Sequence, residues 1–92
     1  MQIDINEIEN KNNIIDIRTS AEFNKFNLGG RNITRMNLLK NPEYYLNKSD
    51  VYYIICNKGT VSLSCSKILN ALGYNCYSVV GGIDYLKKDY RI

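Results

Sequence analysis

Apolar runs and polar segments alternate along the chain at the periods of strands and helices. Residues 51–55 are apolar throughout, which is typical of a parallel strand buried on both faces, so they are predicted to form the central strand. Residues 3–5, 14–17 and 75–80 are predicted to form further strands, the first two of them short. The first of these is expected to lie at an edge and to be followed by one helical turn near residues 6–10.

A short helix is predicted after the second strand. Thr19 and Ser20 can cap it, and Glu22 stands where a capping box requires a carboxylate. The pair Gly29-Gly30 marks the point by which this helix has stopped.

The next segment is predicted to be less regular. Residues 32–39 show no clear period and are expected to be irregular, with one extended piece. Asn41 is a cap residue followed by Pro42, and proline favours the first helical position. A short helix is therefore predicted over residues 42–47.

The longest predicted helix follows the central strand. Its apolar residues recur at helical spacing and are expected to face the core: Val61, Cys65, Ile68, Leu69 and Leu72. Gly73 is predicted to end this helix as a cap glycine. After the strand at 75–80, Gly81-Gly82 is expected to open a last helix that runs through Lys88.

This alternation of strands and helices with short loops predicts an open α/β sheet of mainly parallel strands. In such sheets the chemistry gathers at the carboxyl ends of the strands. Three features are expected there: Asp16 and Arg18 after one strand, Cys56 and its loop after the central strand, and Gly81-Gly82 after the last.

Cys56 is the strongest candidate for a reactive group. It closes the central strand and opens a short turn that contains Gly59 and leads into a helix. Backbone N–H groups and the positive end of a helix dipole stabilise negative charge at such a place, and so favour the nucleophilic thiolate. The simpler alternative is that Cys56 is only a small buried residue at the end of a strand.

Composition narrows the classes of function. The chain has 92 residues, a net charge of +3 and a pI near 8.8, and its scattered positive charges do not indicate a nucleic-acid site. Three cysteines and no histidine argue against a zinc site or a disulfide framework, so neither a metal nor a cofactor is expected. Free thiols, the lack of a secretory signal and the lack of a transmembrane run predict a cytoplasmic protein with no membrane contact, expected to be a monomer.

Four segments in order carry a family pattern. They are Ile15-Asp16-Ile17-Arg18 with Glu22-Phe23, then Ile54-Ile55-Cys56-Asn57-Lys58-Gly59, then Leu69 with Leu72-Gly73-Tyr74, and finally Tyr77 to Gly82. In this order and spacing the chain resembles a single-domain rhodanese, the small sulfurtransferase module, over nearly its whole length. The resemblance implies one rhodanese-like domain over residues 1–92, with a four- to five-stranded sheet and helices on both of its faces.

The resemblance also implies a chemistry. Cys56 would take sulfane sulfur from a small anionic donor such as thiosulfate, hold it as a persulfide and pass it to a thiol, to cyanide or to an acceptor protein. The loop would wrap its N–H groups round the outer sulfur, through Asn57, Lys58, Gly59, Thr60, Val61 and Ser62. A nest of amides at a helix start is an anion site on physical grounds as well.

The chain departs from the family pattern at several positions. Val61 stands where many members end the loop with arginine. The valine cannot clamp an anion through two hydrogen bonds as arginine does, and Lys58 is expected to compensate partly for the lost positive charge. Residues 26–31 lack the histidine and proline of the corresponding family segment, and Leu86 replaces the usual tryptophan.

These departures leave other functions open. One alternative is a non-catalytic rhodanese-like protein-binding module that docks through Val61, Leu63 and the edge at residues 23–26. A cysteine phosphatase would need an arginine in the loop to hold the transition-state oxygens. None is near in sequence, and the loop is one residue short for phosphate.

The remaining candidate residues have structural interpretations. Asp16 and Arg18 are expected to pair with each other, with Glu22 or with loop amides, and to support the floor of the site. Cys65 and Cys76 are expected in the core, although a resolving role for Cys65 stays open. Thr60 and Ser62 are predicted either to donate hydrogen bonds to a bound anion or to cap the helix.

Overall fold

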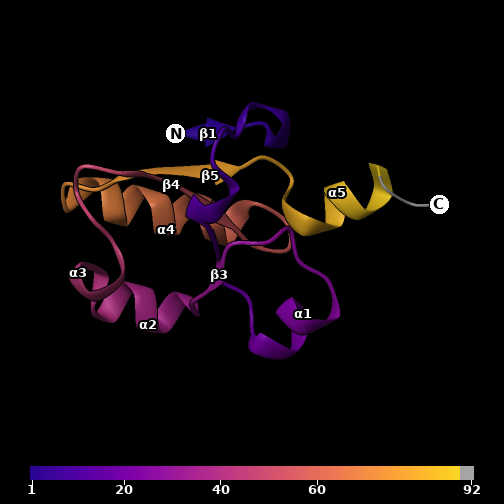
Figure 1. Cartoon of the computed structure of the whole chain (residues 1–92), viewed down its shortest axis with the longest axis horizontal. Coiled ribbons are helices and arrows are strands. Elements are labelled where there is room, and N and C mark those ends of the chain that lie inside the picture. Colours follow the sequence, from indigo (N-terminus) through magenta and orange to yellow (C-terminus); the bar gives the residue numbers. More distant parts are fainter. Residues whose placement is uncertain (90–92) are drawn as a thin grey trace.

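The computed structural model describes residues 1–89, and it contains a five-stranded sheet in which all strands are parallel (Figure 1). The strands lie in the order β1-β5-β4-β2-β3. Their bounds are Gln2–Ile3 for β1, Ile14–Asp16 for β2, Arg31–Asn32 for β3, Val51–Ile55 for β4 and Asn75–Val79 for β5. The predicted α/β class and parallel sheet are therefore confirmed, with β4 in the centre over the predicted residues.

Helices connect the strands. The α-helices are α1 at Ser20–Lys25, α2 at Arg35–Lys40, α3 at Pro42–Tyr45, α4 at Thr60–Ala71 and α5 at Gly82–Asp89. Two short 3₁₀ helices, η1 at Ile5–Glu7 and η2 at Lys11–Asn13, lie between β1 and β2. Figure 1 shows α2 and α3 at one end of the molecule, and α1 and α5 at the other.

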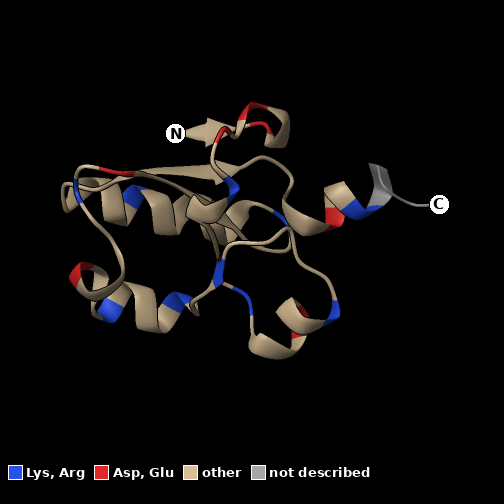
Figure 2. Ribbon diagram, viewed as in Figure 1, with Lys and Arg blue, Asp and Glu red and all other residues tan. Residues whose placement is uncertain are grey.

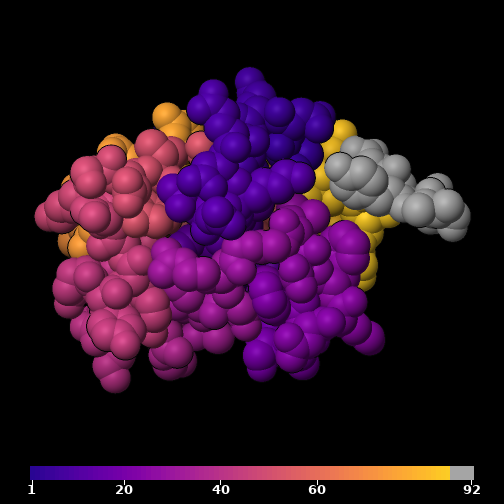
Figure 3. All heavy atoms as spheres, viewed as in Figure 1, coloured from indigo at the N-terminus to yellow at the C-terminus, as the bar shows by residue number. Residues whose placement is uncertain are grey.

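Each face of the sheet has its own core because side chains alternate along each strand. In β4, Tyr52 and Ile54 point to a core that also contains Leu38 of α2 and Leu69 of α4. The other core is built from these residues of the N-terminal segment, the strands and α5: Ile8, Ile14, Tyr53, Ile55, Val79, Ile83 and Leu86. The expected helices on both faces are thus present, and Figure 3 shows the N-terminal segment (indigo) spread over the middle of the visible face.

Two predicted helix ends are confirmed in detail. Thr19 is the N-cap of α1, and its hydroxyl and the Glu22 carboxylate form the predicted capping box. Gly73, with a φ of 102°, follows the end of α4. The N–H groups of Gly73 and Tyr74 donate to the carbonyls of Asn70 and Leu69, the pattern of a Schellman motif.

The prediction for residues 32–39 was partly wrong. The end of β3 at Asn32 agrees with the expected extended piece, but residues 35–39 belong to α2, whose N-cap is Thr34. The Thr34 hydroxyl accepts from the Asn37 N–H, and Leu38 is buried against the first core. A helix of only six residues presents too few apolar positions to show a period, so its start is signalled by the cap rather than by hydrophobicity.

The predicted buried stripe of α4 was also partly wrong. Val61, Ile68 and Leu72 are exposed, whereas Ser62, Cys65, Ser66 and Leu69 form the buried face. Those four positions still recur at helical spacing, but small polar residues occupy half of them. Serine lets the helix lie close to the sheet, and one of these serines reaches the candidate site described below.

No helix within residues 1–89 is long and apolar enough to cross a membrane.

Candidate active site

The candidate site lies at the carboxyl end of the central strand. Cys56 directly follows β4, and α4 begins four residues later at Thr60. Gly59 is the N-cap of α4 with a φ of 90°, which an L-residue with a side chain rarely adopts. The strand, the tight turn and the helix start therefore bend the backbone round the Cys56 side chain, and neither Thr60 nor Ser62 is the helix cap.

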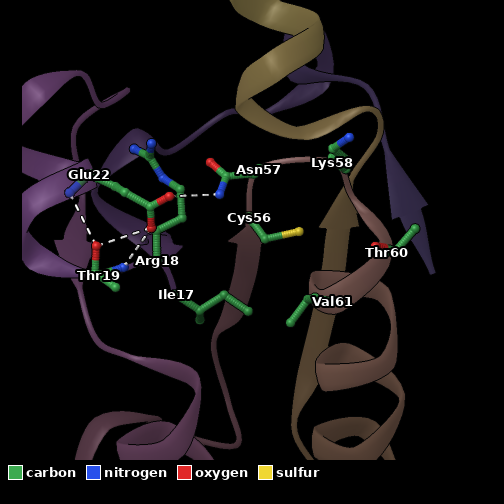
Figure 4. Close-up of a pocket in the computed structure, with 9 residues that line it drawn as sticks. All are labelled: Ile17, Arg18, Thr19, Glu22, Cys56, Asn57, Lys58, Thr60 and Val61. Carbon is green, nitrogen blue, oxygen red and sulfur yellow. Dashed lines mark hydrogen bonds between the residues drawn. The ribbon is translucent and has the colours of Figure 1, made fainter.

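Backbone amides converge on the sulfur. The N–H groups of Gly59 and Ser62 donate to Cys56 Sγ over 3.1 Å and 3.2 Å. Figure 4 shows the sulfur directed toward the first turn of α4, where Thr60 and Val61 lie. These two donors stabilise negative charge on the sulfur and fix its position.

Further amides in the loop are free. Within residues 1–89, the N–H groups of Lys58, Thr60 and Val61 have no hydrogen-bond acceptor in the protein. Such groups at a helix start carry partial positive charge and favour an anion. The loop therefore holds the sulfur with some of its donors and keeps others available.

A pair of buried hydroxyls lies beneath the sulfur. Ser62 Oγ is 3.3 Å from Cys56 Sγ and 2.6 Å from Ser78 Oγ, and both hydroxyl oxygens lie 3.3 Å from the Gly59 carbonyl oxygen. Because each hydroxyl has one hydrogen, one serine donates to the other and at most one of them donates to that carbonyl. The Ser62 hydroxyl can accept from a thiol or donate to a thiolate. Ser78 was not identified in the sequence, but a polar residue near the carboxyl end of β5, on the same face as Cys76, was a signal that could have identified it.

The start of α5 holds the outer side of the loop. The N–H groups of Ile83 and Asp84 donate to the carbonyls of Cys56 and Asn57 over 2.9 Å and 2.8 Å. Those carbonyl oxygens therefore point toward α5 and not toward the sulfur. Gly82, with a φ of 64°, permits this approach, because a Cβ atom there would collide with both oxygens.

This contact predicts that Gly82→Ala destabilises the protein by about 2–4 kcal/mol, from left-handed strain plus the collision. Gly29→Ala is the matched control, since Gly29 also has a positive φ of 91° but has open space round its Cβ position. It is expected to cost only about 1–2 kcal/mol. Urea unfolding of both variants measures the difference, and equal losses would show that the α5 contact contributes nothing.

A buried ion pair lies at the neighbouring strand end. The Asp16 carboxylate accepts from the Arg18 guanidinium at 2.8 Å and from the Arg18 backbone N–H at 3.1 Å. Asp16 is 1% exposed and Arg18 6%, and the guanidinium also donates to the Phe26 carbonyl. The predicted pairing is confirmed, and Arg18 spans from β2 to the end of α1.

Glu22 connects α1 with the loop. Its carboxylate accepts from Asn57 Nδ2 at 2.9 Å and from the backbone and hydroxyl of Thr19 (Figure 4). These hydrogen bonds, that of Asn57 first, lower the pKa of Glu22 below its ordinary value. The carboxylate therefore stays charged at the rim of the site.

The sulfur opens into a pocket of about 400 Å³. Six of the predicted site residues line this pocket: Arg18, Cys56, Asn57, Lys58, Thr60 and Val61. Ile17, Thr19 and Glu22 complete the lining. The other predicted site residues do not line the pocket. Gly59 and Ser62 donate their backbone N–H groups to the sulfur, and Asp16 pairs with Arg18. Cys56 itself is only 5% exposed, so a reactant reaches it through this pocket and not from the open surface.

The other two cysteines lie in the core, as predicted. Burial raises the pKa of Cys65 to about 11 and that of Cys76 to about 12. Both are therefore protonated at neutral pH and are poor nucleophiles. Among the described residues, no three or more His, Cys, Asp or Glu side chains lie together as ligands for a metal ion.

Comparisons with known proteins identify a family. The family model of the rhodanese-like domain matches residues 4–89. A solved structure from Staphylococcus saprophyticus is 31% identical, with a TM-score of 0.80 over 91% of this chain and 90% of that one.

Two further solved structures are similar. A rhodanese-related protein from Thermoplasma volcanium is 26% identical, with a TM-score of 0.73 over 84% of this chain and 77% of that one. A rhodanese homologue from Thermus thermophilus shares the fold at 21% identity and a TM-score of 0.60, over 76% and 77% of the two chains. No functionally curated protein matches the chain. The match over residues 4–89 nevertheless shows that this chain belongs to the rhodanese-like domain family.

Proposed function

We propose that the chain is a sulfurtransferase that carries sulfane sulfur as a persulfide on Cys56. The donor is a small anion such as thiosulfate, and the acceptor is a thiol, cyanide or a thiol of an acceptor protein. The observation that carries the proposal is the convergence of the Gly59 and Ser62 amides on Sγ within a pocket.

The reaction has two halves. The Cys56 thiolate attacks the outer sulfur of thiosulfate, the S–S bond of the donor breaks, and sulfite leaves with the electron pair. In the second half, an acceptor thiolate attacks the outer sulfur of the persulfide and Cys56 leaves as a thiolate. The protein stabilises an anion at each stage and supplies no redox partner.

The loop suits both stages. The amides of Gly59 and Ser62 serve the inner sulfur, and the free amides of Lys58, Thr60 and Val61 are available to the outer one. Fixed dipoles in a pocket stabilise an anion more effectively than water, because they need no reorganisation. In this way, backbone donors supply charge stabilisation at a loop that ends in Val61 rather than in arginine.

Mass spectrometry tests the proposal. Incubation with thiosulfate is expected to add one sulfur atom to the peptide that contains Cys56, and cyanide is expected to remove it as thiocyanate. A known active rhodanese treated in parallel shows that the conditions support loading. An unmodified Cys56 beside a loaded control would contradict the proposal.

A non-catalytic docking module is the second candidate. It is favoured by the exposed apolar residues of α4, since Val61 is 46% exposed and Ile68 and Leu72 lie along the same side. In this case, sulfur loading is absent and Cys56→Ser leaves the biological behaviour unchanged.

A further inference from the structure

A second hollow adjoins the sulfur pocket. It has a volume of about 350 Å³ and lies between α1, the loop and α5. Its lining comprises Arg18, Glu22, Lys25, Asn57, Lys58, Asp84 and Lys87, and we name it the basic hollow. The sulfur pocket also contains Arg18, Glu22, Asn57 and Lys58, so the two spaces meet at the Asn57–Glu22 hydrogen bond.

The free charge in this hollow is positive. Among the side chains that the structure describes, the Asp16–Arg18 pair is the only ion pair, so Arg18 is already neutralised. Lys25, Lys58 and Lys87 remain against the carboxylates of Glu22 and Asp84. Figure 2 shows basic positions at the end of α1 and in α5 on the same side of the molecule.

Two of these lysines lie in surroundings that favour a positive charge. The Lys87 ammonium lies 5.8 Å from the centre of the Phe26 ring, over its face. Lys25 is the last residue of α1, where the negative end of the helix dipole favours a cation. Both residues line the hollow, and neither ammonium group forms an ion pair within the described residues.

The sulfur pocket and the basic hollow differ in chemistry. The sulfur pocket has apolar walls at Ile17 and Val61 and a reactive sulfur, whereas lysines and carboxylates line the basic hollow. Thiosulfate is compact and needs only the sulfur pocket. An acceptor whose charged groups lie several bonds from its thiol would extend through both spaces.

We propose that the basic hollow binds the carboxylate or phosphate end of a low-molecular-weight thiol, the acceptor of the sulfurtransferase reaction proposed above. Its thiolate enters the sulfur pocket while Lys25 and Lys87 hold the distant anionic group, and Glu22 is placed to accept from an amino group of the same molecule. The thiolate attacks the outer sulfur of the Cys56 persulfide and the S–S bond breaks. The electron pair returns to Cys56, and the acceptor leaves as a persulfide.

Acceptor kinetics test this assignment. Protein loaded with sulfur from thiosulfate is mixed with glutathione, which is anionic, or with 2-mercaptoethanol, which is neutral. In Lys25→Gln/Lys87→Gln, the glutathione concentration for half-maximal discharge is expected to rise about five- to tenfold, because two exposed charge contacts are lost. The 2-mercaptoethanol value is expected to change less than about twofold, because this thiol carries no charge. Added salt should reduce the difference between the proteins.

Lys40→Gln/Lys67→Gln is the matched control, since it removes the same charge from α2 and α4. It should leave both thiols unaffected. An equal effect of the two double variants, or an equal effect on both thiols, would overturn the assignment. Normal discharge by glutathione with slower discharge by an acidic acceptor protein would also overturn it, in favour of a protein acceptor.

A binding measurement separates this inference from the proposed function. S-methylglutathione cannot accept sulfur, so its binding to the unloaded protein does not depend on catalysis. Chemical-shift changes round Lys25 and Lys87, weakened in Lys25→Gln/Lys87→Gln but not in the control, are expected even if Cys56 never loads sulfur. If the protein loads sulfur but does not bind S-methylglutathione, the role assigned to the basic hollow is overturned and the proposed function is not.

Discussion

Cys56→Ser is expected to abolish sulfur loading and to lower turnover by at least about 10³-fold. The hydroxyl of serine is protonated at neutral pH and is a far weaker nucleophile toward sulfur than a thiolate. Because the two side chains differ by one atom, the amides of Gly59 and Ser62 and the fold should be preserved. Mass spectrometry after thiosulfate treatment and a thiocyanate assay measure the two losses, and circular dichroism checks the fold.

Cys65→Ala and Cys76→Ala are the controls. Both thiols are buried, and their raised pKa values of about 11 and about 12 leave them protonated at neutral pH. Loading of both variants should therefore match that of the unchanged chain. Loss of loading in Cys65→Ala would instead assign this cysteine a part in the chemistry, and loading of Cys56→Ser would exclude Cys56 as the carrier.

Asp16→Ala is expected to destabilise the protein by about 3–5 kcal/mol. Asp16 and Arg18 are both buried, so the variant leaves a guanidinium out of water with only the Phe26 carbonyl as partner. This prediction holds even if two apolar side chains in place of Asp16 and Arg18 would give an equally stable fold. The cost arises from an uncompensated charge, and urea unfolding measures it.

A double-mutant cycle separates the pair from its surroundings. Arg18→Ala and the double variant complete the cycle, and the double variant should be more stable than the sum of the single losses predicts by about 1–3 kcal/mol. Additive losses would show that the two residues act independently. In that case, the connection from β2 to the end of α1 would not depend on their mutual attraction.

The central part of the fold could be predicted because its signals are local and strong. Residues 51–55 are apolar at every position, and the capping box of Thr19 and Glu22 and the cap glycine Gly73 each determine a helix end. The strand–turn–helix order round Cys56 then determined which amides could face the sulfur. Each of these inferences needs only neighbours along the chain.

The errors round the candidate site have a common cause, which is that the contacts of those side chains are tertiary. Hydrophobicity assigned Val61 and Ile68 to the buried face of α4, but Ser62 and Ser66 occupy it, and the Ser62 hydroxyl contacts the sulfur there. Ser78 and the α5 contacts were missed for the same reason, since they lie far from Cys56 in sequence. The basic hollow joins three separate segments, which the sequence pattern did not bring together.

The hydrogen-bond donors of the loop are backbone N–H groups, so their positions depend on the path of the main chain. Every non-proline residue carries the same N–H group, so residues 58, 60 and 61 can change identity without loss of these donors, provided that Gly59 and Gly82 keep the bend and the approach of α5. Selection on those three side chains is therefore separate from selection on the stabilisation of charge. A lineage could alter them to suit new reactants while the sulfur-holding geometry passes unchanged from ancestor to descendant.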